Sequence, residues 1–305
     1  MKRFALKLLL FLVVFLAFDK LFILVADKSA ESEVDKRLEY VIKGEVNRDV
    51  VIIGSSRGSR DVMAGQIEEA TGLSTYNLCY PGSDVTFHDF VMQSLLEFNE
   101  KPELMVLVVD DSEAFVDGGA MILFRRDRLY PLVKYPYVWK AMAERGYLDK
   151  DLAGLIVLQR LNKYNFDLRQ KVFTPIDTIL DCGSMPVSWQ QKGLDWTYDE
   201  EERIYPIEEE LPEKIAAFQH MVQTCEENQI ELLILFPPNY KPHSQGFEDR
   251  IRELSGDYPH FLLYDTENPV YRDSKSYYDA NHLMTHSARV YTREVIAGIK
   301  ELMEN

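Results

Sequence analysis

The stretch VIIGSSR, Val51–Arg57, is the strongest local signal in the sequence. Its apolar half predicts a buried strand, and the polar residues after Gly54 predict the start of a helix. Gly54 permits a tight turn, which would place the next hydroxyls at the carboxyl end of the strand. There a serine also gains backbone N–H donors for a developing oxyanion. By itself the pattern also fits a phosphate-binding turn or a helix N-cap, although a P-loop is excluded because no Gly-Lys-Ser/Thr follows.

Short apolar runs and amphipathic stretches alternate along the chain. The predicted strands are Asp49–Ile53, Ser74–Leu78, Leu104–Val109, Glu231–Phe236 and Phe261–Tyr264. The predicted helices are Asp61–Thr71, Asp84–Phe98, Glu213–Gln229, Gln245–Leu254 and Ser287–Met303. Strands that alternate with helices imply βαβ units and a parallel sheet covered on both faces. The predicted fold class is therefore α/β, with a flavodoxin-like, doubly wound sheet of five parallel strands.

Three segments of the chain depart from this alternation. The stretch 115–206 is too long for a plain crossover and has its own helical patterning, so we interpret it as a mainly helical insertion or cap over the site. Residues 27–48 are charged and weakly periodic, and they are predicted to form a stalk or a short helix that leads into the domain. Residues 1–26 precede them as an apolar segment, which leaves 49–305 as one α/β domain with the insertion.

The apolar segment has the pattern of a membrane anchor. Basic residues precede the run Leu8–Phe18, and a second run, Leu21–Ala26, follows the charged pair Asp19-Lys20. Together the runs approach the roughly 20 residues that span a bilayer. The basic flank predicts a single-pass membrane protein with its N-terminus in the cytoplasm and its C-terminal domain periplasmic or extracellular. The alternatives are a cleaved signal peptide and a hydrophobic first helix packed on the domain.

Composition excludes some classes of function. The formal net charge of −16 argues against nucleic-acid binding, because no excess of Lys and Arg is present to displace phosphate counterions. The three cysteines permit one disulfide at most and have no zinc-ligand spacing. Five histidines also lack ligand spacing and are predicted to be surface or capping residues: His88, His220, His243, His260 and His286. No metal site is expected.

A second chemical signal lies near the C-terminus, in the stretch Tyr278–Leu283. Asp279 and His282 stand three residues apart before the last predicted helix. At that spacing the carboxylate can orient the imidazole as a general base. Alone, the pair is better explained by a turn-capping Asp and a surface His.

The two signals together resemble the SGNH/GDSL hydrolase family, whose fold is a doubly wound sheet. In the family's first motif, Gly-Asp-Ser-x, the serine is the nucleophile. The residues from Gly54 match this motif with Ser55 in place of the Asp, which implies that Ser56 is the nucleophile. The family's last motif, Asp-x-x-His-Leu, is met in full by Asp279–Leu283, and it implies that His282 is the base that Asp279 orients.

The family's other two motifs are met less fully. Its second, Asn-x-Gly-x-x-Gly, matches Asn77–Gly82 except that Cys79 replaces the first glycine, so Gly82 would supply an oxyanion-hole N–H together with that of Ser56. Its third, Gly-x-Asn-Asp, has no match, and Ser112 stands where the Asn donor would be, among acidic residues. Losing one such donor can cost roughly 2.7–4 kcal/mol of transition-state stabilisation. The resemblance covers about residues 49–112 and 231–303.

The Gly-Ser-Ser variant, the apolar N-terminus and the insertion look most like the envelope branch of the family. That branch includes anchored proteins that help to D-alanylate teichoic acids and proteins that O-acetylate alginate and other exported glycans. The resemblance implies serine-dependent O-acyl transfer or O-acyl ester hydrolysis on an exported cell-envelope polysaccharide, without a cofactor. The implied partners are an acylated glycan or acyl donor and a membrane-bound acyltransferase.

Two hypotheses from other classes stay open. The first is a catalytically weak or inactive SGNH-like module that binds glycan or scaffolds an envelope assembly, which the missing Asn favours. The second is a nucleotide-binding flavodoxin-like domain, which the absence of a Gly-rich phosphate loop disfavours.

Overall fold

The computed structural model describes residues 1–109, 114–119, 121–166, 176–189 and 204–304, together with residues 169, 172, 174, 198 and 201. The chain divides into two compact units. One, the helical unit, consists of Met1–Lys36 and Arg125–Val172. The other, the sheet unit, consists of Arg37–Phe124 and Phe173–Asn305.

The helical unit contains a long first helix, α1 (Lys2–Ser32), which runs without a break through the charged pair and beyond the predicted boundary at Ala26. Its apolar side chains are largely exposed, Phe4, Leu9 and Phe11 among them. Its 31 residues extend about 46 Å at 1.5 Å per residue. By length and composition α1 is able to cross a membrane.

The charged pair inside α1 is compensated within the helical unit. The Asp19 carboxylate is fully buried and accepts hydrogen bonds from the Val157 N–H at 3.0 Å and the Leu158 N–H at 2.8 Å. The Lys20 ammonium donates to the Leu155 carbonyl at 2.8 Å and pairs with Asp19. Asp19 and Lys20 therefore attach a distant segment of the chain to α1, because a buried carboxylate needs such donors.

Most of the described residues of the second segment of the helical unit, Arg125–Val172, lie in short helices. They are α6 (Arg126–Leu129), η1 (Tyr130–Leu132), α7 (Pro136–Glu144), η2 (Val157–Arg160) and α8 (Lys163–Phe166). Among these, η1, η2 and α8 contact α1. This part of the predicted insertion thus forms one compact unit with the N-terminal helix.

The sheet unit is built on five parallel strands. They are β1 (Val50–Gly54), β2 (Thr75–Asn77), β3 (Leu104–Val108), β4 (Glu231–Phe236) and β5 (His260–Leu263). Their order is β2-β1-β3-β4-β5, which is the 2-1-3-4-5 order of doubly wound sheets. The predicted α/β class with five parallel strands is confirmed, and each strand lies within about two residues of its predicted bounds. The order reverses beside β1, so the switch point lies where β1 ends.

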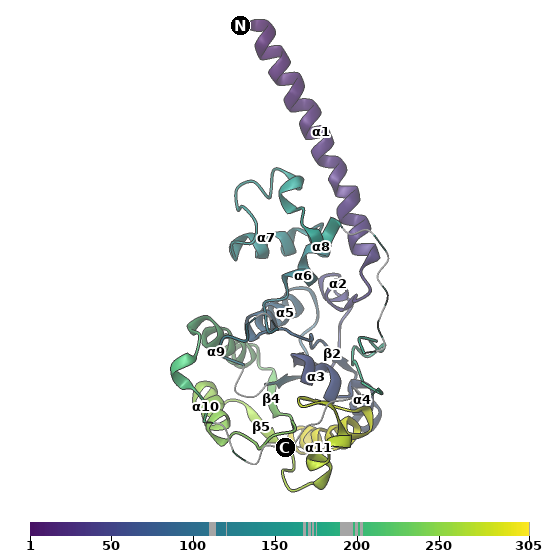
Figure 1. Ribbon diagram of the computed structural model, residues 1–305, viewed down its shortest axis with the longest axis vertical. Coiled ribbons are helices and arrows are strands. Elements are labelled where there is room, and N and C mark those ends of the chain that lie inside the picture. The colour runs from purple at the N-terminus through teal and green to yellow at the C-terminus, as the bar shows by residue number, and fades with distance from the viewer. Residues whose placement is uncertain are drawn as a thin grey trace. The chain divides into compact units, whose positions relative to one another are not determined.

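Helices cover both faces of the sheet (Figure 1). One face carries α3 (Ser56–Asp61), α4 (Ala64–Thr71) and α11 (Thr285–Glu304). The other carries α5 (Val85–Phe98) and α9 (Pro212–Asn228), with α10 (Gln245–Ser255) against α9. The helix predicted over Asp61–Thr71 is instead split into α3 and α4, because Val62 and Met63 have extended backbone.

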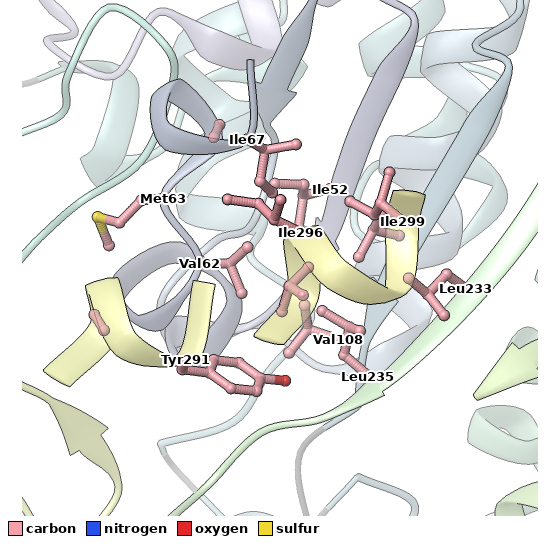
Figure 2. Close-up of a cluster of buried hydrophobic side chains, with 14 of the residues drawn as sticks. Ile52, Val62, Met63, Ile67, Val108, Leu233, Leu235, Tyr291, Ile296 and Ile299 are labelled. Carbon is pink, nitrogen blue, oxygen red and sulfur yellow. The ribbon is translucent and has the colours of Figure 1, made fainter. Parts of the chain in front are cut away.

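The main hydrophobic core lies between the sheet and the helices α3, α4 and α11. Alternate strand residues point to this face, since side chains along a strand alternate. Figure 2 shows Ile52, Val108 and Leu233 from three strands against Ile296 and Ile299 of α11. Burying an aliphatic side chain contributes about 1.5–3 kcal/mol. This packing holds α11 against the strand that leads to Ser56.

Part of the predicted stalk belongs to the sheet unit. Helix α2 (Arg37–Ile42) packs on α5, and Leu38 and Val41 are buried. Val46 is also buried, and its N–H donates to the Asn99 side chain. Residues 37–48 therefore begin with a short helix and pack on the sheet unit through Leu38, Val41 and Val46.

Candidate active site

Asp279 and His282 are brought together by a small hairpin rather than by an open loop. Its strands β6 (Tyr277–Asp279) and β7 (His282–Leu283) are antiparallel, and Asp279 lies opposite His282 across the turn. The His282 Nδ1 lies 2.7 and 2.8 Å from the two carboxylate oxygens of Asp279. The Asn281 N–H also donates to this carboxylate. The turn itself therefore aligns the ring with the acid.

The other nitrogen of the same ring faces Ser56. The distance from His282 Nε2 to Ser56 Oγ is 2.7 Å, although the residues are 226 positions apart in the sequence. The contact predicted from the two motifs is confirmed. Ser56, His282 and Asp279 form a continuous hydrogen-bonded chain of the kind that activates a serine hydroxyl. Their catalytic role stays a prediction.

Asp279 is held as an anion. Its burial by itself would raise the pKa of the carboxyl, but the hydrogen bond and the charge of His282, together with the Asn281 N–H, outweigh burial and hold this pKa below its ordinary value. An ionised Asp279 keeps Nδ1 protonated and leaves the Nε2 lone pair for the serine proton. In this arrangement His282 is able to accept a proton from Ser56.

The two adjacent serines differ in their surroundings. Both line the cavity beside His282, but Ser55 is buried, 3 % exposed, and precedes α3, whereas Ser56 is half-buried and contacts His282. Ser56 is the first residue of α3. This helix has six residues only, so it adds little dipole, and an oxyanion there would depend on individual N–H groups.

The second motif ties β2 to the helix that carries Ser56. The Asn77 amide donates to the carbonyls of Gly58 and Val62, at 2.8 and 3.1 Å, and its oxygen accepts the Cys79 N–H. The Cys79 side chain is fully buried against Gly58, where an added Cβ would lie 2.5 Å from its sulfur. Cys79 therefore fills the space that Gly58, which lacks a side chain, leaves open. This explains how a residue larger than glycine fits at the position of the first glycine in the second motif.

Gly82 lies in a tight turn next to Ser56. Its φ of +70° is in the left-handed region that favours glycine. Gly82 lines the same cavity as Ser56 and His282. The turn is closed by the Ser83 N–H to the Tyr80 carbonyl, and the Gly82 carbonyl accepts the Leu123 N–H. The structure thus brings Gly82 to the site, and its use as an oxyanion donor stays a prediction.

His88 is buried, contrary to the surface or capping position predicted for it. It lies on α5, 7 % exposed, and its Nε2 is 2.8 Å from the Ser83 hydroxyl. Ser83 Oγ also contacts the Tyr80 carbonyl at 2.6 Å. Nothing in the sequence around this single histidine indicates the contact with Ser83. The contact stabilises the turn that contains Gly82.

A buried arginine that the motifs did not reveal supports the same turn. The Arg37 guanidinium is 1 % exposed and donates from Nη1 to the carbonyls of Cys79 and Gly183, at 2.7 and 3.0 Å. It also lies over the Tyr80 ring, 4.4 Å from its centroid. Arg37 thus joins α2, the second motif and the turn at Gly183. Its partners are 42 and 146 residues away, so no local spacing indicates it.

Asp61 is a second buried residue that the sequence pattern did not single out. Its Oδ1 accepts the Leu283 N–H at 2.9 Å, so α3 holds β7 at both ends, through Ser56 and Asp61. Complete burial raises the pKa of Asp61 well above its ordinary value, although the Leu283 N–H and the charge of Arg57 act against the shift. We interpret Asp61 as a largely neutral acid that positions the residue after His282.

We expect Asp61→Asn and Asp61→Ala to have opposite effects on stability at neutral pH. A carboxyl with a raised folded pKa stabilises the fold most below its unfolded pKa of about 4 and loses that contribution as pH rises towards the folded pKa. Asn keeps a neutral acceptor and does not titrate, so its advantage over wild type should be clear at pH 8 and shrink at pH 5. Ala leaves the buried Leu283 N–H unpaired, which costs about 1–3 kcal/mol.

Urea denaturation of the solubilised chain at the two pH values measures both effects. If the Asn variant is less stable than wild type at pH 8, Asp61 is an ionised acceptor and this interpretation is wrong.

The candidate site opens into a cavity of about 280 Å³. Besides Ser56, Gly82 and His282, its lining residues are Ser55, Arg57, Arg60, Pro81, Met121, Ile122 and Asn281. A larger cavity of about 460 Å³ between α4, α11 and the segment around Cys182 contains no comparable acid–base chain. Volume alone therefore does not locate the site.

Some predicted features are untested by this geometry. Ser112 lies outside the described residues, as do Asp110 and Asp111 before it.

All three cysteines are free. Within the described part of the chain, no group of three or more His, Cys, Asp or Glu side chains is placed to hold a metal ion.

Comparison with protein-family models finds no match to this chain, and a search of curated proteins likewise finds none. The resemblance to the SGNH/GDSL family therefore depends on two observations. These are the sequence motifs and the contacts among Ser56, His282 and Asp279.

Proposed function

We propose that the chain is a serine-dependent enzyme of the SGNH type that transfers or hydrolyses O-acyl groups on an exported cell-envelope polysaccharide. The observation that carries this proposal is the 2.7 Å contact between Ser56 Oγ and His282 Nε2, with Asp279 on the other side of the ring. The position of Ser56 after β1, at the switch point of a 2-1-3-4-5 sheet, supports it, since ligands in such sheets bind there.

The proposed reaction has two steps. Ser56 Oγ attacks the acyl carbonyl while His282 Nε2 accepts the hydroxyl proton, and the negative charge on the carbonyl oxygen is stabilised by the N–H groups of Ser56 and Gly82, and by Ser112. His282 then protonates the leaving alcohol, which departs and leaves an acyl-serine. In the second step water or a sugar hydroxyl gives its proton to His282 and attacks the acyl-serine, and Ser56 recovers its proton.

The same proposal includes a location. Helix α1 is long and apolar enough to serve as a membrane anchor, and basic residues stand at its N-terminal end. An N-terminus in the cytoplasm would place the sheet unit outside it, where an exported polysaccharide is accessible.

One labelling experiment tests both parts. We expect a charged, membrane-impermeant fluorophosphonate to label the wild-type chain in intact spheroplasts, and Ser56→Ala to lose the label while Ser55→Ala keeps it. Mass spectrometry of the labelled peptide identifies the modified serine. Label on Ser55, or label that survives Ser56→Ala, contradicts the nucleophile.

The experiment also separates the alternatives. Label that requires lysis of the spheroplasts contradicts export and leaves the nucleophile standing. A folded wild type that is unlabelled under every condition contradicts the enzyme and favours the non-catalytic, glycan-binding module, which the acidic surroundings of Ser112 in the sequence support.

A further inference from the structure

The ionisable residues that line the Ser56 cavity are all basic among those the structure describes. They are Arg57, Arg60 and His282, whereas the chain as a whole carries 50 acidic and 34 basic residues. A lining without acids in such an acidic chain is unexpected unless the cavity accommodates negative charge.

Nearby acids offset this charge only in part. The Asp279 carboxylate is engaged by His282. Asp61 has a raised pKa because it is buried, so its negative charge is suppressed. Asp177 is half exposed and lies 3.8 Å from Arg60 Nη2, too far for a hydrogen bond. Carboxylates thus lie near Arg60, but none of those described forms a hydrogen bond with it.

Arg60 has unused hydrogen-bonding capacity. It is 7 % exposed, and its Nε and Nη1 have no hydrogen-bond partner. A buried donor without a partner costs about 1–3 kcal/mol, and more if it is charged. The side of a guanidinium formed by Nε and Nη2, and the end formed by its two Nη groups, can each bind a carboxylate or phosphate through two hydrogen bonds. Nη2 belongs to both faces, and in Arg60 it lies no closer to Asp177 than 3.8 Å. Arg60 lies one turn after Ser56 on α3, so an anion bound there would be close to the reacting hydroxyl.

We infer that the substrate of the Ser56 site carries an anionic group, a carboxylate or a phosphate, which binds Arg60 next to the ester. This inference rests on the proposed function and narrows it, since the oxygens of a neutral acylated sugar would not compensate the charge of the guanidinium as a carboxylate or phosphate does. Arg57, whose Nη1 donates to the Pro237 carbonyl, adds long-range attraction rather than the primary contact.

Matched pairs of esters test the inference. One pair, 4-nitrophenyl butyrate and the 4-nitrophenyl monoester of succinate, differs in charge on the acyl side. The other, phenyl acetate and 4-acetoxybenzoate, differs on the alcohol side. After correction for alkaline hydrolysis rates, we expect wild type to prefer the anionic ester of at least one pair by about ten- to hundredfold in kcat/KM. The preference should decrease as salt is added.

Substitutions assign the preference to Arg60. Arg60→Met should bring the ratio close to one, whereas Arg60→Lys, which keeps the charge without the fork, should retain a reduced preference. Arg293→Met, an exposed arginine on α11, changes the net charge equally and should leave the ratio unaltered. If Arg60→Met does not fold in a thermal melt, the Arg60→Lys ratio decides.

The outcomes separate the two proposals. A wild type that hydrolyses both members of each pair equally, or an Arg60→Met variant that keeps the preference, overturns the anionic substrate and leaves the serine enzyme intact. A wild type that hydrolyses no ester and takes no fluorophosphonate label overturns the proposed function itself.

Discussion

Replacing His282 with Ala is expected to slow the acylation of Ser56 by about four to six orders of magnitude. The serine hydroxyl is a poor nucleophile unless a base accepts its proton, and His282 Nε2 is the base within hydrogen-bond distance, at 2.7 Å. Asp279→Asn should slow the same step by about 10⁴-fold, because an amide cannot hold the ring in the tautomer that leaves Nε2 unprotonated.

The rate of fluorophosphonate labelling under pseudo-first-order conditions measures this step directly. His260→Ala is the matched control, since this histidine is exposed and contacts Glu231 only weakly, at 3.6 Å. Labelling in His282→Ala within tenfold of the wild-type rate would show that Ser56 does not depend on this base.

The pH dependence follows from the depressed pKa of Asp279. A carboxyl of this kind contributes stability that is present above its unfolded pKa of about 4 and is lost as pH falls through the lower folded value. Asp279 should therefore stay ionised at and above about pH 4, so a loss of labelling that begins above this pH would not come from protonation of Asp279.

Gly183→Ala should have the largest effect on stability, about 3 kcal/mol or more. Gly183 has a φ of +82°, and an added Cβ would overlap the backbone carbonyl of Asn77, which cannot move because its residue pairs with β1. Left-handed backbone costs a non-glycine residue roughly 1–2 kcal/mol, and overpacking adds about 1–3 kcal/mol. The Gly183 carbonyl also accepts from Arg37, so its displacement disturbs the support of the second motif.

Gly72→Ala separates the two contributions. Gly72 ends α4 at a φ of +77°, but nothing lies within 4 Å of an added Cβ, so this variant bears the backbone cost alone. Thermal unfolding followed by circular dichroism should show a decrease in Tm for Gly183→Ala at least twice that for Gly72→Ala. Equal decreases would mean that the turn moves away from Asn77 without cost.

The framework of this protein could be predicted from the amino-acid sequence, because it depends on local patterns. Apolar runs bounded by turn residues predicted all five strands, and alternation with helices implied their parallel arrangement. The contact between Asp279 and His282 was predictable because a tight turn joins residues three apart. The pairing of Ser56 with His282 followed once both motifs were assigned to the same edge of the sheet.

Which charged residues are buried, and which groups they bind, could not be predicted from local patterns and became visible in the folded chain. Asp19 is an apparent defect in an apolar helix until backbone N–H groups 138 and 139 residues away bind it. Arg37, Asp61 and Arg60 look like ordinary surface charges in the sequence, yet each is enclosed by segments distant in the chain. The free energy of a buried charge is set by its partners, and these partners come together only when the chain has folded.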